Sequence, residues 1–178
     1  MAVRRANTTS RTPKTHLASL SSGSSSYSKP LGSHIGEMVW LMGQSPIHRE
    51  LRIKDLDWLL MPPIVLQQYK IFFNDNKTPI GAALWAYLSP EAEAKFKTHG
   101  KIEGEDWGNN AQVDPVKGLV RQEGGTPWLI ELIAPFHTSD NKHREQMVQD
   151  LMNTVLLGQR LKMVHINPAT KQVEEILI

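Results

Sequence analysis

The sequence predicts a mixed α/β (α+β) fold, with a largely antiparallel sheet flanked by helices in one domain behind a polar tail. The main observation is the order of the patterned segments, which runs α, α, β, β, α, β, α, β, β. Both β–β steps cross short polar turns, which are typical of antiparallel hairpins. The chain has 178 residues, 40% of them hydrophobic, which is enough for one domain with a sizeable core.

Residues 1–31 are the predicted tail and residues 32–178 the predicted domain. The tail is rich in Ser, Thr and Arg and has no acidic residue, so it cannot bury enough apolar area to offset its ordering entropy. We expect a disordered extension. A transit peptide is the alternative, although amphipathic periodicity is absent. Without the tail, 15 basic residues face 18 acidic ones, a net charge of −3, so the basic pI does not indicate a nucleic-acid-binding domain.

Two helices are predicted at the start of the domain. Ser33 can cap the first, which ends before Pro46. A short second helix follows His48 and stops at Pro62-Pro63. The apolar face of the first helix consists of Ile35, Met38, Val39 and Met42.

A hairpin and a third helix follow. Residues 67–74 and 80–88 predict two strands joined by a polar turn. Ser89 then supplies an N-cap and Pro90 the first position of a helix, which ends at Gly100.

The last part of the domain predicts a buried strand, a long helix and a second hairpin. Residues 101–126 are polar and glycine-rich, and predict a long loop. Residues 126–134 predict a central strand, because their apolar run leaves neither face polar. A helix capped by Asp140 or Ser139 then runs to Gly158. The final strands are 161–166 and 172–178, with a turn at 167–170.

Several chemistries are excluded by what the sequence lacks. There is no cysteine, so thiolate nucleophiles and thiolate metal sites are absent. No histidine pair has zinc-ligand spacing, and no Walker loop or G-x-G-x-x-G occurs, so we expect neither a metal nor a nucleotide site. Ser45 lies in no G-x-S-x-G elbow and is a poor candidate for a hydrolase nucleophile. No apolar run is long enough to span a membrane and no secretory signal is evident.

His48 and Glu131 are the candidate catalytic pair. His48 follows a helix-ending proline, and an imidazole can accept a proton near neutral pH. Glu131 interrupts an apolar strand, where a carboxylate costs free energy unless it is paired, protonated or used. The alternatives are a surface histidine, and an edge-strand or structural ion-pair role for the glutamate.

A series of short motifs, in a fixed order from about Leu31 to Ile178, resembles the RTX toxin-activating lysine acyltransferases of the hemolysin-activating type. Several ordered motifs are far more specific than any one of them. They are Trp40-Leu41-Met42, Ser45-Pro46-Ile47-His48-Arg49, Pro62-Pro63-Ile64, Gln68-Tyr69, Pro79-Ile80-Gly81, Trp85-Ala86, Leu88-Ser89, Glu105-Asp106-Trp107 and Ile133-Ala134-Pro135-Phe136.

The resemblance implies a cytoplasmic enzyme with a fold of the Gcn5-related N-acetyltransferase type and no permanently bound cofactor. Such enzymes move a fatty acyl chain from acyl carrier protein to internal lysine ε-amines of an RTX protoxin. The family's catalytic histidine falls on His48 and its neighbouring functional serine on Ser45. Its acidic partner, usually aspartate, falls on Glu131, which is the main departure from the family. A homodimer is one expected assembly.

The implied mechanism has His48 accept a proton from the attacking lysine, while Glu131 orients the ring or relays charge. A backbone N–H of residues 131–134 would stabilise the thioester oxyanion. An acyl-His48 intermediate is the alternative route. Core packing is the default expectation for Trp85 and the Met-rich helix of residues 147–156, and lining of an acyl groove is the alternative. The candidate dock for the acidic carrier protein consists of Lys142, His143, Arg144, Arg160 and Lys162.

Two rival functions remain. One is an acyltransferase that uses acyl-coenzyme A, although the Q/R-x-x-G-x-G/A loop that usually binds this donor is absent. The other is an inactive paralogue, a binding module that chaperones a toxin.

Overall fold

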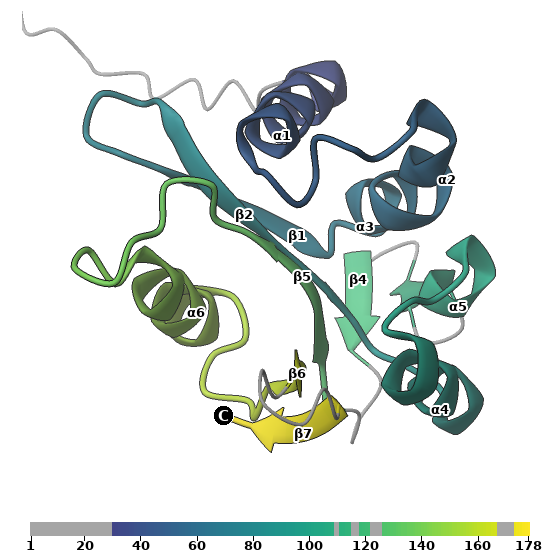
Figure 1. Ribbon diagram of the computed structural model, residues 1–178. Helices are drawn as coiled ribbons and strands as arrows, with labels where there is room; N and C mark the ends of the chain where they lie inside the picture. The colour runs from purple at the N-terminus through teal and green to yellow at the C-terminus, as the bar shows by residue number, and fades with distance from the viewer. Residues whose placement is uncertain (1–29, 109–110, 115–117, 122–125, 167–172) are drawn as a thin grey trace, which may run out of the picture.

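A five-stranded sheet forms the centre of the computed structural model, which describes residues 30–108, 111–114, 118–121, 126–166 and 173–178 (Figure 1). The strand order is β1-β2-β5-β6-β7, and each neighbouring pair is antiparallel except β5–β6. The predicted mixed α/β domain with a largely antiparallel sheet is confirmed. The strands are β1 (Tyr69–Phe73), β2 (Pro79–Ala86), β5 (Trp128–Ile133), β6 (Lys162–Ile166) and β7 (Val173–Leu177).

Helices cover both faces of this sheet, as Figure 1 shows. One face packs on α6 (His143–Thr154), which buries Met147 and Leu151. The opposite face holds the larger core, where Trp107 and Trp128 are almost wholly buried. The elements on that side are α1 (Leu31–Gln44), the 3-10 turn η1 (Ile53–Asp55), α2 (Leu56–Leu59), α3 (Met61–Val65), α4 (Pro90–His99) and α5 (Gly104–Gly108).

The predicted helix α4 is confirmed at both ends. The Ser89 side chain accepts a hydrogen bond from the Ala92 N–H, and Pro90 occupies the first turn. Gly100 ends the helix with a φ of 64°, in the left-handed region that glycine adopts without a Cβ penalty.

The predicted boundaries of two other helices were wrong. α1 begins at Leu31 after Pro30, and no side chain caps it, so Ser33 lies inside the helix. Pro62 and Pro63 open α3 instead of ending a helix, because a first-turn residue needs no N–H partner.

Helix α6 also starts later than predicted, and one face residue of α1 was misplaced. α6 follows Lys142, whose φ of 49° is left-handed, and neither Asp140 nor Ser139 caps it. In α1, Met38, Leu41 and Met42 are buried, whereas Val39 is exposed. The buried stripe of α1 therefore follows i, i+3 and i+4 from Met38.

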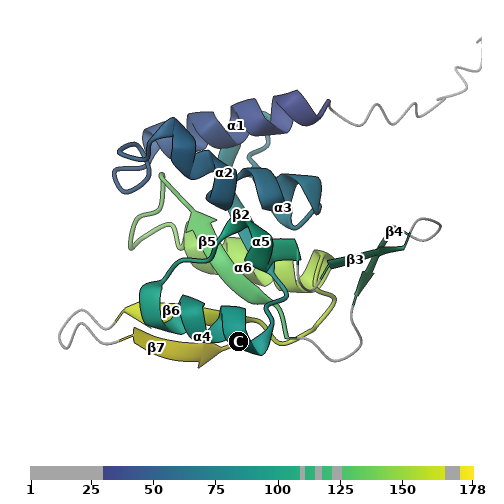
Figure 2. The ribbon, with the colours of Figure 1, turned by 90° about the vertical axis from the view of Figure 1, so that its right-hand side faces the viewer.

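The segment predicted as a long loop, residues 101–126, contains regular structure. It holds α5 and a separate two-stranded hairpin, β3 (Ala111–Asp114) paired with β4 (Gly118–Arg121). Figure 2 shows this hairpin projecting from the side of the domain. Of the predicted disordered tail, residues 1–31, only Pro30 and Leu31 are described, and its boundary was wrong because Leu31 is the first residue of α1. The rest of the tail and the predicted turn at 167–170 lie outside the described residues. Within the described ranges, no helix combines the length and apolar character needed to cross a membrane.

Candidate active site

Ser45, His48 and Glu131, the three predicted site residues, lie together. Ser45 and His48 come from the loop after α1 and are 4% and 6% exposed. The Ser45 Oγ atom lies 2.7 Å from Nδ1 of His48. On the other side of the ring, Nε2 lies 3.2 Å from Oε1 of Glu131, which β5 supplies. The fold therefore brings the Ser45, His48 and Glu131 side chains into one series of contacts, which the sequence only suggested.

The loop after α1 holds the imidazole through a single tight turn. Ser45 has extended backbone angles, as expected of a residue before proline, and Pro46 prevents α1 from continuing. The backbone N–H groups of His48 and Arg49 both donate to the Ser45 carbonyl, at 3.1 and 3.0 Å. This turn puts the serine hydroxyl and the ring three residues apart on the same side of the loop.

An irregularity in β5 explains how a carboxylate is accommodated in the central strand. Leu84 of β2 is opposite Glu131, but the next residue, Trp85, is opposite Leu129, so β5 has one extra residue there. Trp128, Ile130 and Ile133 all belong to the larger core. In a regular strand, Ile130 and Ile133 would point to opposite faces of the sheet, because side chains alternate. Such a bulge re-aims side chains, and here it lies next to Glu131.

The contact between His48 and Glu131 is close but not an aligned hydrogen bond. Nε2 has no hydrogen-bond partner, although the carboxylate oxygen is 3.2 Å away. The same oxygen accepts the Leu132 N–H at 3.1 Å, which helps to fix the carboxylate. The Glu131 side chain is 33% exposed, so a cation from solvent can reach it.

The tautomer of His48 decides what this arrangement can do. The 2.7 Å contact with Ser45 fits a proton on either Oγ or Nδ1. With the proton on Nδ1, Nε2 carries a lone pair beside a carboxylate. That pair of groups can attract an ammonium and then accept one of its protons.

A pocket of about 180 Å³ opens beside His48. Its walls are apolar side chains of α1 and of the segment from Leu51 to Leu56, together with Gly43, Arg49 and Arg52. Sequence alone does not predict this pocket, because its lining residues come from several elements and form no sequence motif.

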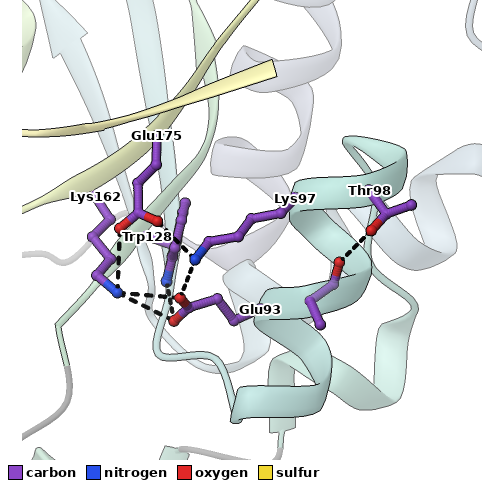
Figure 3. A network of polar contacts seen from close by, with 7 residues as sticks. Glu93, Lys97, Thr98, Trp128, Lys162 and Glu175 are labelled. Carbon is purple, nitrogen blue, oxygen red and sulfur yellow. Dashed lines mark hydrogen bonds and ion pairs between the residues drawn. The ribbon is translucent and has the colours of Figure 1, made fainter. Parts of the chain in front are cut away.

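A second polar cluster joins α4 to the paired ends of β5, β6 and β7 (Figure 3). Glu93 contacts Lys97 at 2.6 Å, Lys162 at 3.2 Å and the Trp128 indole N–H at 3.1 Å. Glu175 contacts the same two lysines, at 2.7 and 3.4 Å. Two cations thus face two carboxylates, and the cluster is balanced in charge.

Electrostatics in this cluster favour ionised carboxylates. Burial alone would raise the pKa of Glu93, but hydrogen bonds from Lys97, Lys162 and Trp128 hold it below its usual value. Hydrogen bonding to Lys97 likewise lowers the pKa of Glu175. Lys162 was predicted as part of a dock for an acidic carrier. It forms ion pairs with two carboxylates of this chain, those of Glu93 and Glu175.

Two further predictions have structural outcomes. Trp85 and Met147 pack in the core between the sheet and α6, 5% and 3% exposed, which confirms core packing as the default for both and excludes the alternative that they line an open acyl groove. Lys142, His143 and Arg144 lie at the start of α6, and their role as a dock stays a prediction. Among the described residues, no three His, Asp or Glu side chains are arranged as metal ligands.

Comparisons with known proteins give consistent matches. The RTX toxin acyltransferase family matches residues 31–178. A leukotoxin-activating lysine acyltransferase of a Pasteurella haemolytica-like species is 34% identical over 57% of this chain and 53% of its own length. An uncharacterised Synechocystis protein is 30% identical over 78% of this chain and 83% of its own. A protein-lysine myristoyltransferase of Kingella kingae is 29% identical over 66% and 64%. The chain thus spans about half the length of the leukotoxin-activating relative.

Proposed function

Because the chain belongs to the RTX toxin acyltransferase family, we propose that it acylates lysine ε-amines of an RTX protoxin. The acyl donor in this proposal is a fatty acyl group carried as a thioester on acyl carrier protein. The observation that carries it is the buried His48 between the Ser45 hydroxyl and the Glu131 carboxylate.

The acceptor lysine enters as an ammonium and first loses one proton to solvent, because only the neutral amine can attack; the second proton leaves the nitrogen during the attack itself. The partly exposed Glu131 carboxylate attracts the ammonium toward Nε2 of His48. As the N–C bond forms, Nε2 accepts the amine proton and becomes imidazolium, which Glu131 stabilises. The C–S bond then breaks, and the imidazolium returns a proton to the departing thiolate. Ser45 keeps the ring in the required tautomer and orientation throughout.

The thioester carbonyl needs donors for its developing negative charge. The register of β5 with β6 covers only Trp128 and Leu129, opposite Lys162 and Met163. Beyond Leu129, no strand of the described residues pairs with the edge of β5 that faces β6, which supports backbone N–H groups of residues 131–134 as oxyanion donors, except that of Leu132, which already donates to Oε1 of Glu131. Direct attack is preferred over an acyl-His48 intermediate, since both ring nitrogens already face protein groups at 2.7 and 3.2 Å.

A fatty acyl donor agrees with the activity for which the Kingella kingae relative is named, that of a protein-lysine myristoyltransferase. The acyl-coenzyme A alternative lacks support in the sequence, which has no Q/R-x-x-G-x-G/A loop.

Intact-mass spectrometry of an unacylated RTX protoxin tests the proposal. The full chain and acyl carrier protein loaded with a myristoyl group should add the mass of one or more acyl groups. His48→Ala should lower the transfer rate roughly 10²- to 10⁴-fold through loss of the base. His99→Ala, an exposed histidine at the end of α4, is the matched control and should keep the wild-type rate.

Two results would count against this function. Protoxin binding with no mass change would favour the chaperone alternative. Wild-type rates in His48→Ala would exclude His48 as the base. A parallel reaction with myristoyl-coenzyme A identifies the donor class. If acyl carrier protein is the donor, myristoyl-coenzyme A should give no transfer.

A further inference from the structure

We propose that the pocket beside His48 is the subsite for the donor's acyl chain, and that Gly43 sets the chain length it admits. This inference rests on the proposed acyl transfer and names the part of the site that recognises the donor. The pocket lies at the residue that would act as base, so a chain inside it would carry its thioester at the reacting centre.

The walls of the pocket fit a hydrocarbon chain. Val39 and Met42 of α1 face Leu51, Ile53 and Leu56 across it. Val39 and Ile53 are 42% and 87% exposed, which leaves apolar surface in water that an acyl chain would cover. An apolar cavity of about 150 Å³ can bind benzene, so about 180 Å³ accommodates roughly six methylene groups.

Charge separates the acyl chain from the acceptor lysine. Arg49 and Arg52 belong to the pocket lining, and Glu131 does not. An incoming ammonium is therefore repelled at the pocket and attracted at the Nε2 side of His48, where the carboxylate lies. A neutral hydrocarbon chain is not repelled by the arginine charges, and it can pack against the aliphatic part of each arginine side chain. Donor and acceptor thus have different approaches to the same imidazole.

Gly43 is the position where the chain can alter this volume. It lies in α1 and in the pocket lining, and no atom of the described residues comes within 4 Å of the place where its Cβ would be, so a side chain can be added at this edge of the pocket without a clash. Gly36 is the matched control. It lies in the same helix, is exposed, has equally open surroundings and is not part of the pocket lining.

The experiment is an internal competition between two donors. Full-length wild type, Gly43→Ala, Gly43→Leu and Gly36→Leu each receive equal amounts of butanoyl- and octanoyl-acyl carrier protein, with an unacylated RTX protoxin as acceptor. Intact-mass spectrometry gives the ratio of the two products. This ratio reports relative kcat/KM for the two donors and does not depend on how much of a variant is folded.

We expect Gly43→Leu to shift the ratio toward butanoyl, which still fits the narrowed pocket, with Gly43→Ala intermediate and Gly36→Leu equal to wild type. A buried CH₂ contributes about 0.8 kcal/mol, so each methylene excluded from the pocket should change the product ratio about fourfold, and two should change it about fifteenfold. An unchanged ratio in Gly43→Leu, with active wild type, would overturn this inference alone. So would a uniform loss with both donors, which would assign the pocket to the acceptor. No transfer by wild type from either donor would overturn the proposed function as well.

Discussion

Replacing Glu131 with glutamine is the sharpest test of the His48–Glu131 contact. Glutamine keeps the shape and retains an oxygen that can accept the Leu132 N–H, which now goes to Oε1 at 3.1 Å. It removes the negative charge that lies 3.2 Å from Nε2 of His48. The substitution therefore isolates the charge from the packing and the hydrogen bond.

The expected magnitude follows from that distance. Two unit charges 3.2 Å apart interact by about 5 kcal/mol at an effective dielectric constant near 20. Glu131 is 33% exposed, and solvent screening reduces this to roughly 2.5 kcal/mol. Imidazolium forms only as the proton is transferred, so the loss falls on the transition state. At 1.36 kcal/mol per factor of ten, Glu131→Gln should lower kcat about 70-fold.

Single-turnover acyl transfer to an unacylated RTX protoxin measures this loss without interference from product release. Glu91→Gln, an exposed carboxylate on α4, serves as the control and should match wild type. With saturating protoxin, so that attraction of the acceptor no longer limits the rate, the double variant with His48→Ala should be no slower than His48→Ala alone, because Glu131 stabilises the imidazolium only when the ring is present. A Glu131→Gln rate within threefold of wild type would refute the reasoning and leave Glu131 a structural ion-pair partner.

The other predictions concern Ser45 and the cluster in Figure 3. Ser45→Ala removes a hydrogen bond worth about 1 kcal/mol and should slow transfer roughly fivefold; a loss as deep as that of His48→Ala would instead indicate an acyl-serine route. For Glu93, the folded-state pKa lies below the unfolded value of about 4.5, so its stabilisation is complete above that pH and is lost as pH falls through the folded-state pKa. Glu93→Gln should therefore lower the free energy of unfolding at neutral pH and converge with wild type in acid, in urea titrations at several pH values. Glu91→Gln, again the control, should show no such convergence, and a pH-independent gap for Glu93→Gln would contradict the electrostatic explanation.

The sequence predicted the sheet and most helices because local signals and tertiary packing agree there. Helix α4 shows this most clearly, since Ser89, Pro90 and Gly100 act at its ends as their chemistry requires. The start of α6 shows the opposite case. Ser139 and Asp140 are good caps by type, but the chain turns through a left-handed Lys142 and begins the helix three residues after Asp140. A cap signal fixes a helix end only when packing allows that end.

The candidate site was predictable in membership but not in geometry. His48 and Glu131 stand out by residue type and surroundings, whereas their 3.2 Å separation depends on pairing between β2 and β5. The extra residue near Ile130 leaves no trace in the pattern Trp128–Ile133, which simply looks buried on both faces. The pocket was hidden for a similar reason, because Gly43 and Leu56 become neighbours only when α1 and α2 pack together.

The bulge also bears on the length of the side chain at position 131. The family resemblance predicted aspartate there, and this chain has glutamate. With the backbone of β5 fixed, an aspartate would end about 1.5 Å short, one C–C bond. The glutamate side chain, by contrast, places Oε1 3.2 Å from Nε2, so the longer acid is the one that makes this contact from the bulged strand. A buried imidazole and a carboxylate in a central strand both cost stability, and a protein that only bound a toxin would gain nothing from aligning them. Their alignment across two distant segments therefore favours catalysis over simple binding.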